Sequence, residues 1–112
     1  MTARAWLQLL LVSIGLVAVG NAYGQDAEAR LVIRGHRFEP TELTVPAGKK
    51  VKLVIENLDD TAEEFESYEL NREKVVAPKG QIIIYVGPLQ PGRYPFFGDF
   101  HKDSAQGVLI AK

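Results

Sequence analysis

The sequence predicts an all-β domain, a Greek-key β-sandwich of seven to eight strands. Apolar and polar residues alternate along most of the chain after residue 25, and β-branched residues are frequent, as is typical of half-buried strands. Glycine and proline interrupt these segments at intervals of roughly 8–12 residues, a spacing typical of sandwiches. No segment after residue 25 shows a convincing helical period. A chain of 112 residues has room for one domain at most.

Each expected strand is bounded by a turn signal or a charged loop. The clearest is 50–57, where Val51, Leu53 and Ile55 lie on one face. Residues 81–86 form an apolar run typical of a buried strand. We also expect strands at 30–34, 42–45, 74–76, 93–97 and 107–111, a turn at 38–40, an acidic loop at 58–63 and a short extended or irregular piece at 65–70.

The composition excludes several classes of protein. With 46% hydrophobic residues, the chain has enough apolar side chains to bury a core. It contains no cysteine, so a disulfide framework, a thiolate metal site and a nucleophilic cysteine are all excluded. The formal net charge of −1 argues against a nucleic-acid partner, which requires a basic face.

Residues 1–24 have the pattern of a secretory signal peptide. Arg4 is followed by an apolar stretch over 5–19, and Ala22 and Gly24 provide small residues at the spacing that signal peptidase requires. The alternative is a permanent membrane anchor, which needs about 20 apolar residues. Cleavage near Ala22–Gly24 is favoured because two polar residues, Gln8 and Ser13, interrupt the apolar stretch. We therefore expect a domain at 25–112, exported to a bacterial periplasm without a membrane anchor.

Carboxylates are crowded in the middle of the chain. If 64–66 is extended, Glu64 and Glu66 project to one face while Phe65 enters the core. Their mutual repulsion is relieved by a cation, and hard oxygen ligands suit iron, manganese or calcium, or Cu(II) if imidazole joins them. The alternative is a solvated acidic surface. The six acidic residues concerned are Asp59, Asp60, Glu63, Glu64, Glu66 and Glu69.

The segment 97–101 carries one of the two histidines. His101 follows Asp99 and lies between aromatic residues and the last strand, which makes it a candidate metal ligand. The alternative is a histidine that only hydrogen-bonds the loop. His36 precedes Arg37, whose charge disfavours a bound cation, so it is a weaker ligand candidate than His101 and we expect it to lie on the surface.

Three stretches resemble small cupredoxins. They are Phe38–Asn57, the Pro91–His101 loop segment and the closing Gly107–Ile110. A blue-copper member of that family has a histidine where this chain has 63–65, a cysteine at Gly98, a histidine at His101 and a methionine at Gln106. Only His101 remains, so the resemblance implies a cupredoxin-like fold without a blue-copper electron-transfer centre.

The segment 64–76, together with 97–101, is similar to the cupredoxin-like domain of EfeO-type proteins. Those proteins serve periplasmic iron uptake alongside Ftr-type permeases. The resemblance implies a domain that binds metal through acidic residues and the last loop, with an inner-membrane iron permease or other periplasmic uptake components as partners.

We therefore predict a periplasmic metal-binding protein that hands iron or Cu(II) to an uptake or homeostasis system. The expected ligands are Glu64, Glu66, Asp99 and His101. Two alternatives remain open, namely an accessory enzyme of ferroxidase type and a metal-free β-sandwich that serves as an interaction module.

Overall fold

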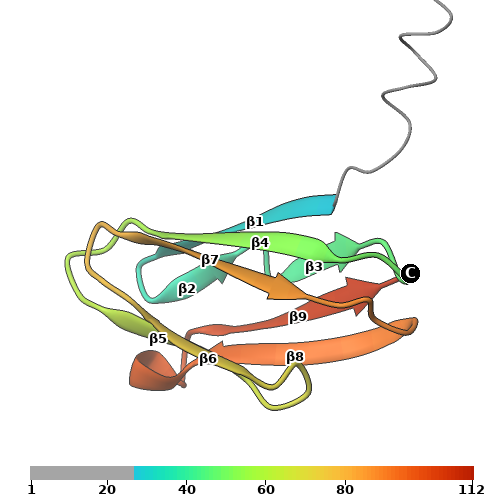
Figure 1. The fold of residues 1–112 in the computed structure, drawn as a ribbon. Helices are drawn as coiled ribbons and strands as arrows, with labels where there is room; N and C mark the ends of the chain where they lie inside the picture. The colour runs from blue at the N-terminus through green and yellow to red at the C-terminus, as the bar shows by residue number, and fades with distance from the viewer. Residues whose placement is uncertain (1–26) are drawn as a thin grey trace, which may run out of the picture.

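The structure, a computed structural model that describes residues 27–112, is a β-sandwich of two layers (Figure 1). One sheet has four strands in the order β2-β1-β4-β7, and the other has five in the order β3-β9-β8-β5-β6. The predicted all-β sandwich is confirmed, and the expected signal peptide lies outside the described residues. The elements are β1 Ala27–Arg34, β2 Arg37–Glu39, β3 Glu42–Val45, β4 Val51–Asn57, β5 Glu63–Ser67, β6 Arg72–Val76, β7 Gln81–Val86, β8 Gly92–Gly98, the 3-10 helix η1 Asp99–His101 and β9 Gln106–Ala111.

Both sheets are mixed, because one parallel pair occurs in each. β1 runs parallel to β4 from Ala27 opposite Val51 to Ile33 opposite Asn57, and β3 runs parallel to β9. The pairing with β4 explains why β1 begins three residues before the expected position. All other strand pairs are antiparallel.

Within residues 27–112 there are nine strands, more than the seven to eight predicted. The additional strand is β2, in a segment where we expected a turn at 38–40. It pairs with β1 through a two-residue turn at Gly35 and His36, whose φ angles are 59° and 58°. Positive φ at both central residues is the geometry that joins two twisted antiparallel strands most tightly.

Three phenylalanines form the centre of the core between the two sheets. The ring of Phe38 meets those of Phe65 and Phe96 edge-on, with centroids 6.1 Å and 5.0 Å away. All three side chains are at most 1% exposed. Such edge-to-face contacts add to the stabilisation that burial provides. No helix among the described residues has the length and apolar character needed to cross a membrane.

Two edge strands, β6 and β7, lie next to each other on one side of the sandwich (Figure 1). The guanidinium group of Arg72 on β6 donates two hydrogen bonds to the backbone carbonyl of Tyr85 on β7, at 3.1 Å and 2.9 Å. An occupied carbonyl cannot accept a hydrogen bond from another strand. Arg72 therefore joins the two sheets and partly protects the β7 edge from pairing with another chain.

Candidate functional site

Side chains of β5 alternate between the core and the surface. Glu63, Phe65 and Ser67 are buried, whereas Glu64 and Glu66 are half-buried on the outer face. This confirms the predicted placement of Phe65 in the core and of Glu64 and Glu66 on one face. The strand begins at Glu63, so the acidic loop is one residue shorter than expected.

Three carboxylates converge on the outer face of the five-stranded sheet. β5 pairs with β8, with Glu66 opposite Phe97, and Asp99 follows directly after β8. One carboxylate oxygen from each of Glu64, Glu66 and Asp99 lies within 4.8 Å of the other two. We call these three residues the carboxylate cluster. It brings together three of the four predicted ligands.

Glu73 on β6 borders the carboxylate cluster and was not among the predicted ligands. It lies directly opposite Glu66 in the β5–β6 register. Like charges at directly opposed positions destabilise a strand pair. Partial burial raises the pKa of Glu64 above its usual value, and the neighbouring Glu73, Asp99 and Glu66 raise it further. Glu73 would have been found if β6 had been expected to start at residue 72 instead of 74.

One cation of the protein is placed beside the carboxylate cluster. Lys102 Nζ lies 3.2 Å from Asp99 Oδ1. The hydrogen bond to Asp99 and the charge of that carboxylate raise the pKa of Lys102. A single ammonium group against several carboxylates leaves the cluster with net negative charge.

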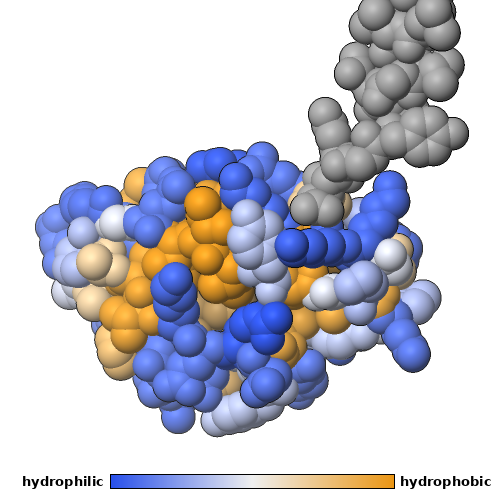
Figure 2. All heavy atoms as spheres, in the orientation of Figure 1, coloured by the Kyte–Doolittle hydropathy of each residue, from blue (hydrophilic) through white to orange (hydrophobic). Residues whose placement is uncertain are grey.

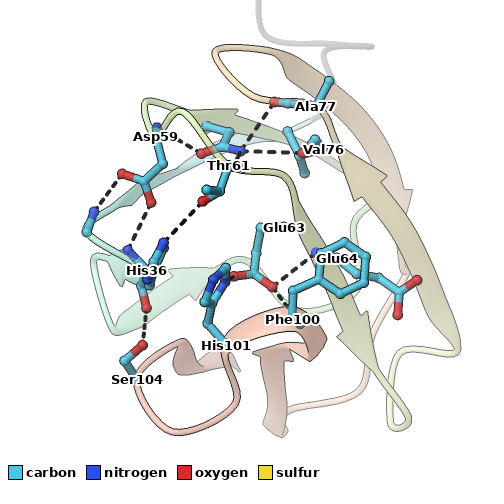
Figure 3. Close-up of polar contacts among 12 residues, drawn as sticks. His36, Asp59, Thr61, Glu63, Glu64, Val76, Ala77, Phe100, His101 and Ser104 are labelled. Carbon is cyan, nitrogen blue, oxygen red and sulfur yellow. Dashed lines mark hydrogen bonds and ion pairs between the residues drawn. The ribbon is translucent and has the colours of Figure 1, made fainter.

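His101 does not lie with the carboxylate cluster. Its Nδ1 contacts Oε2 of Glu63, a carboxylate that is only 1% exposed. Oε1 of Glu63 accepts hydrogen bonds from the backbone N–H groups of Phe100, at 2.9 Å, and Glu64, at 3.1 Å (Figure 3). A carboxylate can only accept hydrogen bonds, so an ionised Glu63 requires the proton of this contact to be on Nδ1 of His101.

His36 is half-buried at the surface, and its contact with His101 was not predicted. Its ring stacks on that of His101, with centroids 3.5 Å apart and planes 12° from parallel. Its Nε2 lies 3.1 Å from Thr61 Oγ1, and its backbone carbonyl accepts a hydrogen bond from Ser104 Oγ at 2.6 Å. The tight β1–β2 turn places His36 toward η1, a neighbourhood that the sequence did not reveal. We call this end of the sandwich, with Glu63, His36 and His101, the pole.

The loop between β4 and β5 is anchored at the same end by two polar side chains. Asn57 is fully buried, and its amide donates to the carbonyls of Thr61, at 2.9 Å, and Ala77, at 3.2 Å. The Asp59 carboxylate accepts hydrogen bonds from the backbone N–H groups of His36 and Gly35, at 2.9 Å and 2.8 Å (Figure 3). The hydrogen bond from His36 is the main cause that lowers the pKa of Asp59.

The pole does not fit a blue-copper centre. Such a centre needs a thiolate and two imidazoles, and the chain contains no cysteine. The space beside His101 is taken by the carboxylate of Glu63, and Nδ1 of His101 is engaged by it. The side chains at the pole therefore do not form a blue-copper centre.

The two mixed sheets and the loops that meet at the pole define a sandwich of the cupredoxin class. The chain belongs to the cupredoxin-like domain family, whose pattern it matches over residues 7–111. The family confirms the broader resemblance that the sequence predicted.

Relatives of this chain include a sequence that is identical at about half of the aligned positions. "Uncharacterized protein RP394" from Rickettsia prowazekii is 51% identical over 83 residues, which are 74% of this chain and 66% of that protein. The chain thus spans just under two thirds of the length of that relative.

Solved structures share the fold at low sequence identity. The blue copper protein auracyanin A from Chloroflexus aurantiacus superposes with a TM-score of 0.67 at 14% identity, over 79% of this chain and all of that one. The Cu(I)-bound metal-binding domain of the exporting ATPase CopA from Streptococcus pneumoniae gives 0.61 at 15% identity, over 76% of this chain and 84% of that one.

Proposed function

We propose that this protein is an exported metal-binding protein that holds a hard cation, foremost iron, at the carboxylate cluster and passes it to an uptake system. The observation that carries the proposal is the convergence of Glu64, Glu66 and Asp99, each offering an oxygen within 4.8 Å of the other two. Iron is favoured by the resemblance to EfeO-type domains in the segment that contains these residues.

The donor chemistry supports a hard cation. All three side chains offer carboxylate oxygens, and Glu73 lies beside them as a fourth acidic group. Oxygen donors suit Fe(III), Fe(II), Mn(II) or Ca(II), whereas Cu(I) prefers thiolate and thioether sulfur. With His101 engaged by Glu63, we propose a ligand set of carboxylates without imidazole, so Cu(II) ranks below iron.

Electrostatics supports cation binding as well. The raised pKa of Glu64 means that the folded protein disfavours a full set of ionised carboxylates. A bound cation relieves this repulsion, and it competes with protons for the same oxygens. Affinity is therefore expected to rise with pH through the titration of Glu64 and to level off above it.

The test is a titration of the mature domain with Fe(II), Fe(III), Mn(II), Cu(II) and Zn(II), made on the wild type and on Glu66→Gln. We expect Glu66→Gln to weaken iron binding about tenfold or more, since a lost charged ligand is worth at least about 1.4 kcal/mol. Iron should also raise the melting temperature of the wild type, because it binds only the folded state.

Glu69→Gln is the matched control. It removes the same charge three residues further along, from an exposed position in the turn after β5. Its iron affinity should equal that of the wild type. Equal affinity of Glu66→Gln and the wild type would refute the proposed site, and the acidic residues would then serve solubility alone.

A second candidate function is a metal-free interaction module, which is favoured by exposed apolar side chains on β6 and β7. Val75, Ile83 and Tyr85 are 48%, 40% and 46% exposed. Figure 2 shows hydrophobic side chains gathered on the side that these strands present. A flat titration with every metal would make this the leading function.

A further inference from the structure

Gly98, the last residue of β8, lies against the buried carboxylate of Glu63. A Cβ added at Gly98 would lie 2.6 Å from Cδ and 2.7 Å from Oε1 of Glu63. It would also lie 2.7 Å from Cβ of Ala105 on the other side. The backbone of Gly98 is extended, with φ −96° and ψ 112°, a conformation that any residue adopts. Glycine is therefore required here by space and not by conformation.

The carboxylate of Glu63 cannot move aside easily. Its two oxygens take the backbone N–H groups of Glu64 and Phe100 and the Nδ1 atom of His101. Moving it would break all three contacts and leave the buried carboxylate of Glu63 without partners, which costs more than the hydrogen bonds themselves contribute. The obstacle to a side chain at position 98 is thus held in place from three directions.

We infer that Glu63 and Gly98 pack against each other in a way that leaves the pole no room for a metal-binding side chain at position 98. The carboxylate fills the volume that a ligand at position 98 needs, and it also occupies the nitrogen of His101 that faces inward. The residues at positions 63 and 98 therefore differ from those of a blue-copper centre together, because the packing of one depends on the other. A cysteine introduced at position 98 alone cannot produce a copper centre. The inference goes beyond the proposed function, which concerns the outer carboxylate cluster.

Two variants test the pair directly. Both carry Ala105→Gly to remove the second close contact, and both carry Gly98→Cys. They differ only in Glu63→His, which supplies the second imidazole in place of the carboxylate. His101 is present in both, and the resemblance to small cupredoxins puts Gln106 at the position of the weak axial ligand, for which glutamine is acceptable.

We expect freshly reduced E63H/G98C/A105G to develop an intense visible thiolate-to-copper absorption with Cu(II), and G98C/A105G to remain without it. A control, E63H/G92C, places the thiol at the other end of β8. An added Cβ at Gly92 meets nothing closer than 3.7 Å, so this variant should fold and stay colourless. Strong colour in G98C/A105G overturns the inference, as does a folded but colourless E63H/G98C/A105G.

A second measurement does not depend on copper or on cysteine. In the Ala105→Gly background, Gly98→Ala should lower the melting temperature by about 5 °C or more, which for a domain of this size corresponds to about 1 kcal/mol. With Glu63→Ala also present, the same Gly98→Ala change should lower it much less, because the obstructing carboxylate is gone. Additive losses would mean that the two positions are independent and would overturn the inference. The proposed function is tested by iron titration of the carboxylate cluster in the protein with Glu63 and Gly98 intact. The result of that titration does not depend on these variants, so either proposal can fail without the other.

Discussion

Glu63 and Glu64 are neighbours in the chain, yet their carboxylates lie in opposite environments. Glu63 is 1% exposed and fully hydrogen-bonded at the pole, whereas Glu64 is half-buried among other acids on the outer face. The alternation of side chains along β5 separates them. One residue thus serves the packing of the pole, and the next is available to a cation.

Under the proposed function, Lys102 competes with the bound cation for Asp99, with which it forms an ion pair. We expect Lys102→Met to strengthen iron binding only modestly, by about 1.5-fold to 5-fold, since an exposed ion pair contributes little. Calorimetric titration measures the change. Lys52→Met is the control, because Lys52 pairs with Glu28 on the other sheet and should have no effect. Unchanged affinity in Lys102→Met would show that Asp99 is not a ligand.

At the scale of elements, the β1–β2 turn, the β4–β5 loop and η1 hold one another in place. Asp59 binds the turn through two backbone N–H groups, and Ser104 and the ring of His101 contact His36 from the other side. Glu63 holds the start of η1 through Phe100. Since Asp99 is the first residue of η1, these contacts also position a member of the carboxylate cluster.

Asp59→Asn should destabilise the domain at neutral pH by about 1 kcal/mol. The substitution replaces one of the two partly exposed carboxylate oxygens with an NH2 group, which cannot accept a hydrogen bond from the turn. The pKa of Asp59 is lowered in the folded state, so its contribution is present above the unfolded value of about 3.9 and is lost as pH falls below it. Urea unfolding at pH 7 and at pH 3 measures both. The difference between wild type and Asp59→Asn should shrink at pH 3.

Asp60→Asn is the comparison for that experiment. Asp60 is exposed and pairs with Lys79, at 3.5 Å, so its removal should change the free energy of unfolding little at either pH. An Asp59→Asn protein as stable as the wild type at pH 7 would show that the turn is held by its own geometry.

At the scale of the whole molecule, we predict that the leading segment and the folded domain have separate roles. We predict that residues 1–24 are absent from the exported protein, because the small residues at Ala22 and Gly24 follow the apolar stretch directly. Intact-mass measurement of periplasmic material tests this. A full-length mass in the membrane fraction would instead make the segment an anchor.

Local patterns determined most of the fold. Alternation and turn residues predicted β3 and β7 with their observed bounds and β4 to within a residue. The same alternation placed Glu64 and Glu66 on one face and Phe65 in the core. The absence of cysteine was by itself enough to exclude a thiolate centre. All of these follow from composition or from the two-residue period of a strand, which sets the face that each neighbouring side chain takes.

The tertiary structure alone decided which distant groups meet. His101 was predicted to join the carboxylates, but it contacts Glu63, 38 residues away. His36 stacks on it only because β2 forms a tight hairpin with β1, and Glu73 faces Glu66 only because β6 begins at Arg72. Strand alternation tells which face a side chain takes, whereas strand pairing and register decide its neighbours. Those depend on packing across the whole sandwich, so no local pattern contains them.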